Sequence, residues 1–287
     1  MRKVSSIGAL LVVTAMLAAA CTVGGPAPTD WKVKPVSIQV VKDEDRDGGD
    51  EPYVIQLGFR SKLGVANSSS AALSSQCYTH GLPANNAAPM GSTIAIPAGK
   101  ADVSFPQAQN LDIGDVLLKT APLEIFGTLT FVMERDGIFA DGCAISDALK
   151  SALVGVLRDA LNLLIAASPV PPTQEQLINL IVSHLGDFLS SVGSIIGSII
   201  EGLGNPDDIM GVGVQILLPT AGAFTDLLNT AFAIGGLFEP GLEHGFIPVD
   251  GLPNTVKIKV GSLIPSTATF DFDGPTGHYI YNDVISH

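Results

Sequence analysis

The sequence lacks the short motifs that mark several classes of enzyme. It has 3 cysteines and 5 histidines in 287 residues, and it contains no CxxC pair, no HExxH motif and no G-x-S-x-G motif. A structural zinc site, a zincin and the nucleophile turn of an α/β-hydrolase are therefore not indicated. A catalytic triad assembled from residues far apart in the sequence leaves no such motif, so an exported hydrolase stays open as an alternative.

Positive charge is also scarce. The chain has 15 Lys and Arg against 28 Asp and Glu, which gives a formal net charge of -13. A protein that binds nucleic acid needs a basic surface, so this balance excludes nucleic acid as a partner. The hydrophobic fraction of 46% is large enough for a sizeable core.

The N-terminus reads as an export signal. Arg2 and Lys3 precede an apolar stretch from Ile7 to Leu17, and three small residues follow before Cys21. Cys21 and the "TVGGPAPTD" stretch after it resemble the lipid-acceptor cysteine and flexible tether of bacterial lipoproteins, although that pattern prefers leucine one position closer to the cysteine than Leu17. The sequence predicts a signal peptide at 1–20, a tether at 21–34, and export with a membrane anchor at Cys21. Cleavage after Ala20 with release of the protein is the alternative.

Two cysteines remain in the exported chain. An exported protein with two cysteines most often pairs them, so we expect a disulfide between Cys77 and Cys143. The bond would restrict the unfolded chain and thereby stabilise the fold.

Residues 35–287 are expected to form one β-rich domain. Apolar residues recur at every second position in 36–41, in 53–59 and in several later runs, up to "TATFDFD" and "HYIYNDVI" near the C-terminus. We interpret 36–41 and 53–59 as a hairpin. Strands before and after the middle of the chain predict a single antiparallel β-sandwich or open barrel.

The middle of the chain has a helical period. Residues 144–204 carry apolar stripes at helical spacing, with a capping box at Thr173 and Gln176, so we expect an inserted α-helical hairpin and a β-rich α+β class. The second helix is apolar enough to raise the alternative of a lipid-interacting protein. His184 and Asp187 inside that helix argue against a membrane span.

An acidic stretch, "KDEDRDGGDE", suggests an ion site. Asp43, Asp45 and Asp47 alternate before a glycine, as in the first half of a calcium loop, and Asp50 follows. Valine at the twelfth position excludes an EF-hand. We expect these four carboxylates to converge on calcium, joined by Asp271 and Asp273 from an acidic turn between two late strands. The alternative is that both acidic segments are solvated strand tips that keep the protein soluble.

Two resemblances bear on function. The acidic loops are similar to those with which C2 domains bind calcium at one end of a sandwich. The segment "GGDEPYVIQLGFR" resembles a group of uncharacterised bacterial exported proteins, which implies no activity. We therefore expect an exported, membrane-anchored binding protein of the cell envelope rather than an enzyme, with a small molecule, a lipid or a protein as its ligand.

Overall fold

The computed structural model describes residues 28–43, 49–62, 65, 67–68, 70–73, 78–79, 87–108, 124–135, 207–218, 245–247, 256–274 and 277–287. These residues contain twelve strands and no helix. The strands are β1 (Thr29–Lys42), β2 (Tyr53–Lys62), β3 (Ser70–Leu73), β4 (Tyr78–Thr79), β5 (Thr93–Ala95), β6 (Val103–Ala108), β7 (Glu124–Arg135), β8 (Asp207–Leu218), β9 (Gly245–Ile247), β10 (Val256–Ser262), β11 (Ser266–Asp273) and β12 (His278–Ser286).

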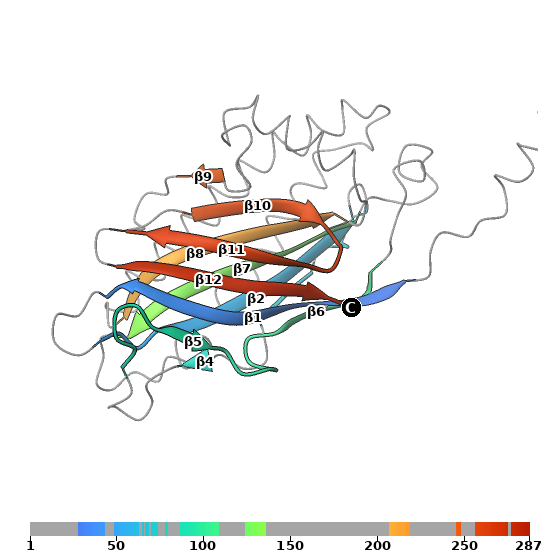
Figure 1. Cartoon of the computed structure of the whole chain (residues 1–287). Coiled ribbons are helices and arrows are strands. Elements are labelled where there is room, and N and C mark those ends of the chain that lie inside the picture. Colours follow the sequence, from blue (N-terminus) through green and yellow to red (C-terminus); the bar gives the residue numbers. More distant parts are fainter. Residues whose placement is uncertain are drawn as a thin grey trace, which may run out of the picture.

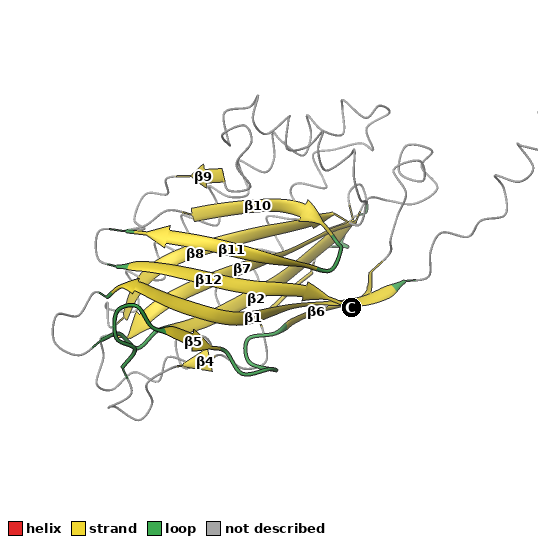
Figure 2. Ribbon diagram, in the orientation of Figure 1, coloured by secondary structure: helices red, strands yellow, loops and turns green. Residues whose placement is uncertain are grey.

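The strands form two sheets (Figure 1). The 5-stranded sheet has the order β11-β12-β1-β5, with β6 also paired to β1. The 7-stranded sheet has the order β3-β2-β7-β8-β10-β9, with β4 paired to β2. Neighbours run antiparallel except for β8 and β10, which are parallel. Figure 2 shows that strands account for all the regular structure of the described residues.

The two sheets pack face to face as a sandwich. Along β12 the side chains of Tyr279, Tyr281, Asp283 and Ile285 are buried, whereas those between them are half exposed. This alternation is the pattern of a strand with one face in a core and one toward water. The inner faces meet closely, since a Cβ atom built on Gly211 of β8 would lie 2.1 Å from Cγ of Phe272 on β11.

The central strands of the 7-stranded sheet are buried on both faces. Every residue of β2 from Tyr53 to Phe59 is buried, and so is every residue of β7 from Phe126 to Glu134. A strand that is buried on both faces has a nearly continuous apolar sequence, which explains why "YVIQLGF" alternates only weakly.

Three sequence expectations need comment. The α+β class is wrong for the described residues, because they form strands alone, and the expected helical hairpin at 144–204 lies outside them. The hairpin of 36–41 with 53–59 is also wrong, because β1 belongs to one sheet and β2 to the other. The alternation of apolar residues along β1 is the same whether this strand pairs with β2 or with β12, so the sequence could not distinguish the two pairings. Residues 29–34, which we assigned to the tether, belong to β1.

Strand register defines the two ends of the sandwich. Lys42 at the end of β1 pairs with His278 at the start of β12, and Asp273 at the end of β11 pairs with the same residue. We call this end, with Asp43, Asp50, Glu51, Glu134, Asp271 and Asp273, the acidic end. The opposite end, where Thr29 begins β1 and β12 finishes near the C-terminus, is the tether end (Figure 1). The described part of the chain contains no helix with the length and hydropathy of a membrane span.

Candidate functional site

Among the described residues, polar and ionisable side chains gather at the acidic end and in a layer inside the sandwich. At the acidic end, Asp50 is fully buried although it lies in the charged connection between β1 and β2. Its backbone pairs with Ala88, with N to O distances of 3.1 and 2.7 Å. Its side chain accepts a hydrogen bond from the hydroxyl of Tyr279, a buried residue of β12. Asp50 therefore joins the β1–β2 connection to the start of β12.

Asp271 and Asp273 lie on the other side of the 5-stranded sheet. They alternate with Phe270 and Phe272, whose side chains are in the core, so the two aspartates face outward. Asp271 Oδ1 lies 2.7 Å from Nε2 of His278, and its side chain is 54% exposed. An exposed pair of this kind contributes little to stability.

The expected calcium ligands are thus only partly brought together. Asp43 is half-buried at the end of β1, while Asp45 and Asp47 lie outside the described residues. Asp50 points into the sandwich, and Asp271 and Asp273 point away from it. Among the described residues, no group of three or more Asp, Glu, His or Cys side chains could hold a metal ion. A calcium site that uses Asp45 and Asp47 stays a prediction. Cys21, Cys77 and Cys143 also lie outside the described residues.

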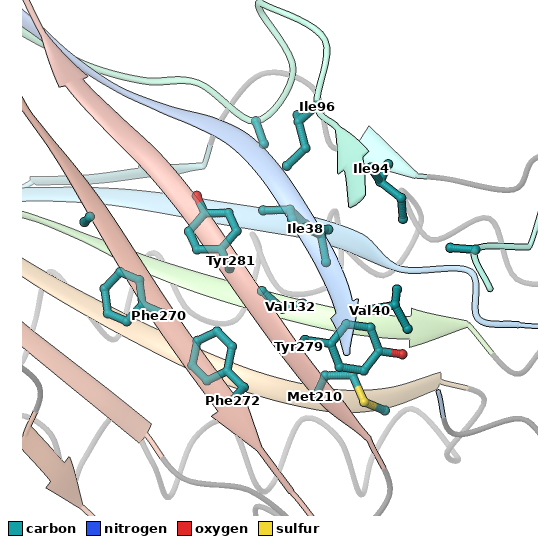
Figure 3. Close-up of a cluster of buried hydrophobic side chains, with 14 residues drawn as sticks. Ile38, Val40, Ile94, Ile96, Val132, Met210, Phe270, Phe272, Tyr279 and Tyr281 are labelled. Carbon is teal, nitrogen blue, oxygen red and sulfur yellow. The ribbon is translucent and has the colours of Figure 1, made fainter. Parts of the chain in front are cut away.

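Two hydrophobic clusters lie in the described part of the interior. One fills the half toward the acidic end and includes Val40, Val132, Met210, Phe272 and Tyr279 (Figure 3). The other fills the half toward the tether end, and its large members are Trp31, Phe105, Phe126, Leu217 and Ile285.

Buried polar side chains lie between the two clusters. We call this set the inner polar layer: Gln56 of β2, Thr128 and Thr130 of β7, Gln215 of β8, and Tyr281 and Asp283 of β12. All six are at most 3% exposed. Strand register aligns them, because Gln56 pairs with Thr130 and Thr128 pairs with Gln215 on the 7-stranded sheet.

One half of the inner polar layer is well hydrogen-bonded. With its amide oriented by its neighbours, Gln56 donates to the backbone oxygens of Ala101 at 2.9 Å and Val33 at 3.3 Å, and accepts from Thr130 Oγ1 at 3.1 Å. In this orientation the amide oxygen of Gln56 lies 3.4 Å from the hydroxyl oxygen of Tyr281. Ala101 has a φ of 56°, a conformation that non-glycine residues rarely adopt. The hydrogen bond from Gln56 helps to hold it there.

Asp283 lies in the other half. Burial raises its pKa to about 7, while the positive charge of Lys259 on β10, the side-chain amide of Gln215 and the backbone amide of Ala268 act in the opposite direction. Neither amide completes a hydrogen bond, because both carboxyl oxygens of Asp283 are without a hydrogen-bonding partner. Burial, and secondly the charge of Asp283, raise the pKa of Tyr281 well above its usual value, so this phenol stays protonated.

Asp102, just before β6, borders the inner polar layer. Its pKa is raised by partial burial, against the charges of Lys34 and Lys32 and a hydrogen bond from the Gly99 backbone. Its Oδ1 atom is buried without a partner. The sandwich therefore holds ionisable groups at its centre as well as at its acidic end.

Sequence reasoning missed the inner polar layer, although a signal was present. In "HYIYNDVIS" the residues Tyr279, Tyr281, Asp283 and Ile285 share one face by alternation. An aspartate among tyrosines and isoleucine on a core-facing strand indicates a buried carboxyl. The "YVIQLGF" strand similarly places Gln56 among apolar residues.

Comparison with known proteins adds no homologue. No family model, no curated protein and no solved structure matches the chain. The resemblances to C2-type loops and to exported proteins therefore stay predictions.

Proposed function

We propose that the chain is an exported β-sandwich protein that is anchored to a membrane by lipid on Cys21 and binds its ligand through the acidic end. The observation that supports this proposal is the direction of β1. This strand begins at Thr29, eight residues after Cys21, and runs to Lys42. Its 14 residues rise about 3.3 Å each, so the strand extends about 45 Å from the tether end to the acidic end.

An anchor at Cys21 would therefore hold the acidic end away from the membrane. A surface of anionic lipid repels carboxylates, so this orientation is also the electrostatically favourable one. Asp271 and Asp273 would face solvent at the same end of the sandwich as Asp43, where a cation or a basic ligand can reach them. We favour a binding role over an enzymatic one, because the described residues of the acidic end present carboxylate acceptors.

Replacing Cys21 by serine tests the anchor. Wild-type protein made in a bacterium that processes lipoproteins should incorporate labelled palmitate and sediment with membranes. Cys21→Ser should lose both properties, whereas the matched control Cys77→Ser should keep the label. Unlabelled wild-type protein in the soluble fraction would instead support cleavage after Ala20 and release.

Calcium is the proposed ion at the acidic end, held by Asp43, Asp45 and Asp47. Chelation should lower the melting temperature by several degrees, since calcium at one hundred times its dissociation constant would stabilise the fold by about 2.7 kcal/mol. The double variant Asp45→Asn, Asp47→Asn should lose this response. Asp30→Asn, which removes one negative charge at the tether end, should keep it. Identical melting with and without chelator would leave these aspartates as solvated charges.

A further inference from the structure

Three neighbouring side chains inside the sandwich have oxygen atoms that lack hydrogen-bonding partners. They are both carboxyl oxygens of Asp283, Oε1 of Gln215 and Oγ1 of Thr128. Asp283 and Thr128 are 0% exposed and Gln215 is 3% exposed. Buried polar atoms in folded proteins are nearly always satisfied, and an exception calls for an explanation such as an ordered water or an ion.

Strand register brings these oxygens to one place. Thr128 and Gln215 are direct partners on β7 and β8, and both side chains are on the inner face of the 7-stranded sheet. Partners on one face have Cβ atoms about 5 Å apart. Asp283 faces them from the 5-stranded sheet, close enough to the Gln215 amide for that group to lower its pKa.

The atoms left over at this place are acceptors. A hydroxyl can donate as well as accept, whereas amide and carboxylate oxygens accept only. Once Asp283 has lost its proton, the missing component must therefore supply donors or positive charge. Lys259, the register partner of Gln215 on β10, supplies charge nearby. Its Nζ atom lies over the ring of Phe270, 5.9 Å from the ring centroid, and gives no hydrogen bond to Asp283.

We propose that Asp283, Gln215 and Thr128 form a binding site for a small monovalent cation, Na⁺ or K⁺. Oxygen atoms are the ligands that hard cations prefer, and this set combines carboxylate, amide and hydroxyl oxygens. Divalent ions are usually held by several carboxylates, whereas here there is one, and the charge of Lys259 further disfavours an ion of higher charge. The site is separate from the acidic end and does not depend on the function proposed above.

Thermal unfolding in three salts tests the site. The full mature chain is heated at pH 8 in sodium, potassium or choline chloride at equal ionic strength, with chelator present to remove calcium. Choline is the control cation, because side-chain oxygens do not coordinate a bulky quaternary ammonium ion as they do Na⁺ or K⁺. We expect sodium or potassium to raise the melting temperature by a few degrees over choline, with saturation as the concentration rises.

Three variants assign the effect to these residues. Asp283→Asn should abolish the sodium or potassium response. Thr128→Val keeps the side-chain shape and removes one ligand, so it should weaken the response while leaving the protein folded in choline. Asp30→Asn makes the same charge change on an exposed side chain at the tether end and should respond like the wild type.

Three results would overturn the proposal. Equal melting temperatures in all three salts would mean that ordered water satisfies the oxygens. An undiminished sodium response in both Asp283→Asn and Thr128→Val would place the cation elsewhere. In a parallel series without chelator, a larger, Asp283-dependent response to calcium than to sodium would show a divalent site. If Asp283→Asn does not fold, Thr128→Val and ²³Na relaxation measurements on the wild type decide between the same outcomes.

Discussion

Replacing Asp283 by asparagine should change how stability depends on pH. The carboxyl has a pKa of about 7 in the folded protein, because burial disfavours its charged form. In the unfolded chain its pKa returns to about 3.9. Between about pH 4 and pH 7, the carboxyl is therefore protonated in the folded protein and ionised in the unfolded chain.

The sign follows from this difference in bound protons. Because the folded state binds more protons, the free energy of unfolding falls as the pH rises through this window, by about 1.4 kcal/mol for each pH unit, and levels off above pH 7. Between pH 5 and pH 8 the loss amounts to about 3 kcal/mol. Asparagine has nearly the same shape and cannot ionise, so the variant should lack this loss and be more stable than the wild type at pH 8.

Chemical denaturation at pH 5, 6, 7 and 8 measures the effect. The measurements are made in choline salts, because a cation at the inner polar layer would compete with the proton for Asp283. Taking the difference between variant and wild type removes the contributions of the other carboxylates. The difference should grow by about 3 kcal/mol across the range. Parallel stability curves, or a variant less stable than the wild type at pH 8, would refute the reasoning.

Three further predictions concern packing, the acidic end and the cysteines. Gly211→Ala should lower the free energy of unfolding by about 1 to 3 kcal/mol in urea, because its Cβ would lie 2.1 Å from Phe272 Cγ; the control Gly213→Ala, with its nearest contact at 3.2 Å, should lose less. Tyr279→Phe should lose about 1 to 3 kcal/mol by leaving Asp50 without its hydroxyl partner, and an unchanged urea midpoint would contradict the buried contact. Mass spectrometry of the unreduced exported protein should find Cys77 bonded to Cys143, and two alkylatable thiols would disprove the bond.

The sequence predicted the longer strands but neither the shorter ones nor most of the strand partners. The apolar pattern located β1, β2, β7, β8, β10, β11 and β12, because a period of two identifies which residues share a face, whereas β3, β4, β5, β6 and β9 were not predicted. The turn between Asp273 and His278 also allowed β11 and β12 to be placed as neighbours. The sequence could not reveal that β1 and β2 belong to different sheets. The sheet that contains β1 depends on its contacts with strands more than 200 residues away, such as β12.

The candidate sites show a similar limit. Clustered carboxylates are visible in a sequence, so the acidic stretch could be identified. The sequence could not show that Asp50 and Asp271 differ in burial and in hydrogen-bonding partner. The structure separates them, with one buried against Tyr279 and the other beside His278 on the surface. The inner polar layer was missed because its six residues come from four strands, and each of them alone resembles an ordinary polar residue of a strand.

The inner polar layer is not explained by stability. Buried polar groups without partners weaken a fold, and apolar residues of similar size would pack the two clusters into one continuous core. Thr128→Val should therefore leave the protein at least as stable in choline as the wild type. Tyr279 and Asp283 share one face of β12, so the same strand holds Asp50 at the acidic end and the carboxyl at the centre. Unsatisfied polar groups on an otherwise apolar face are the kind of local conflict that is expected at functional sites.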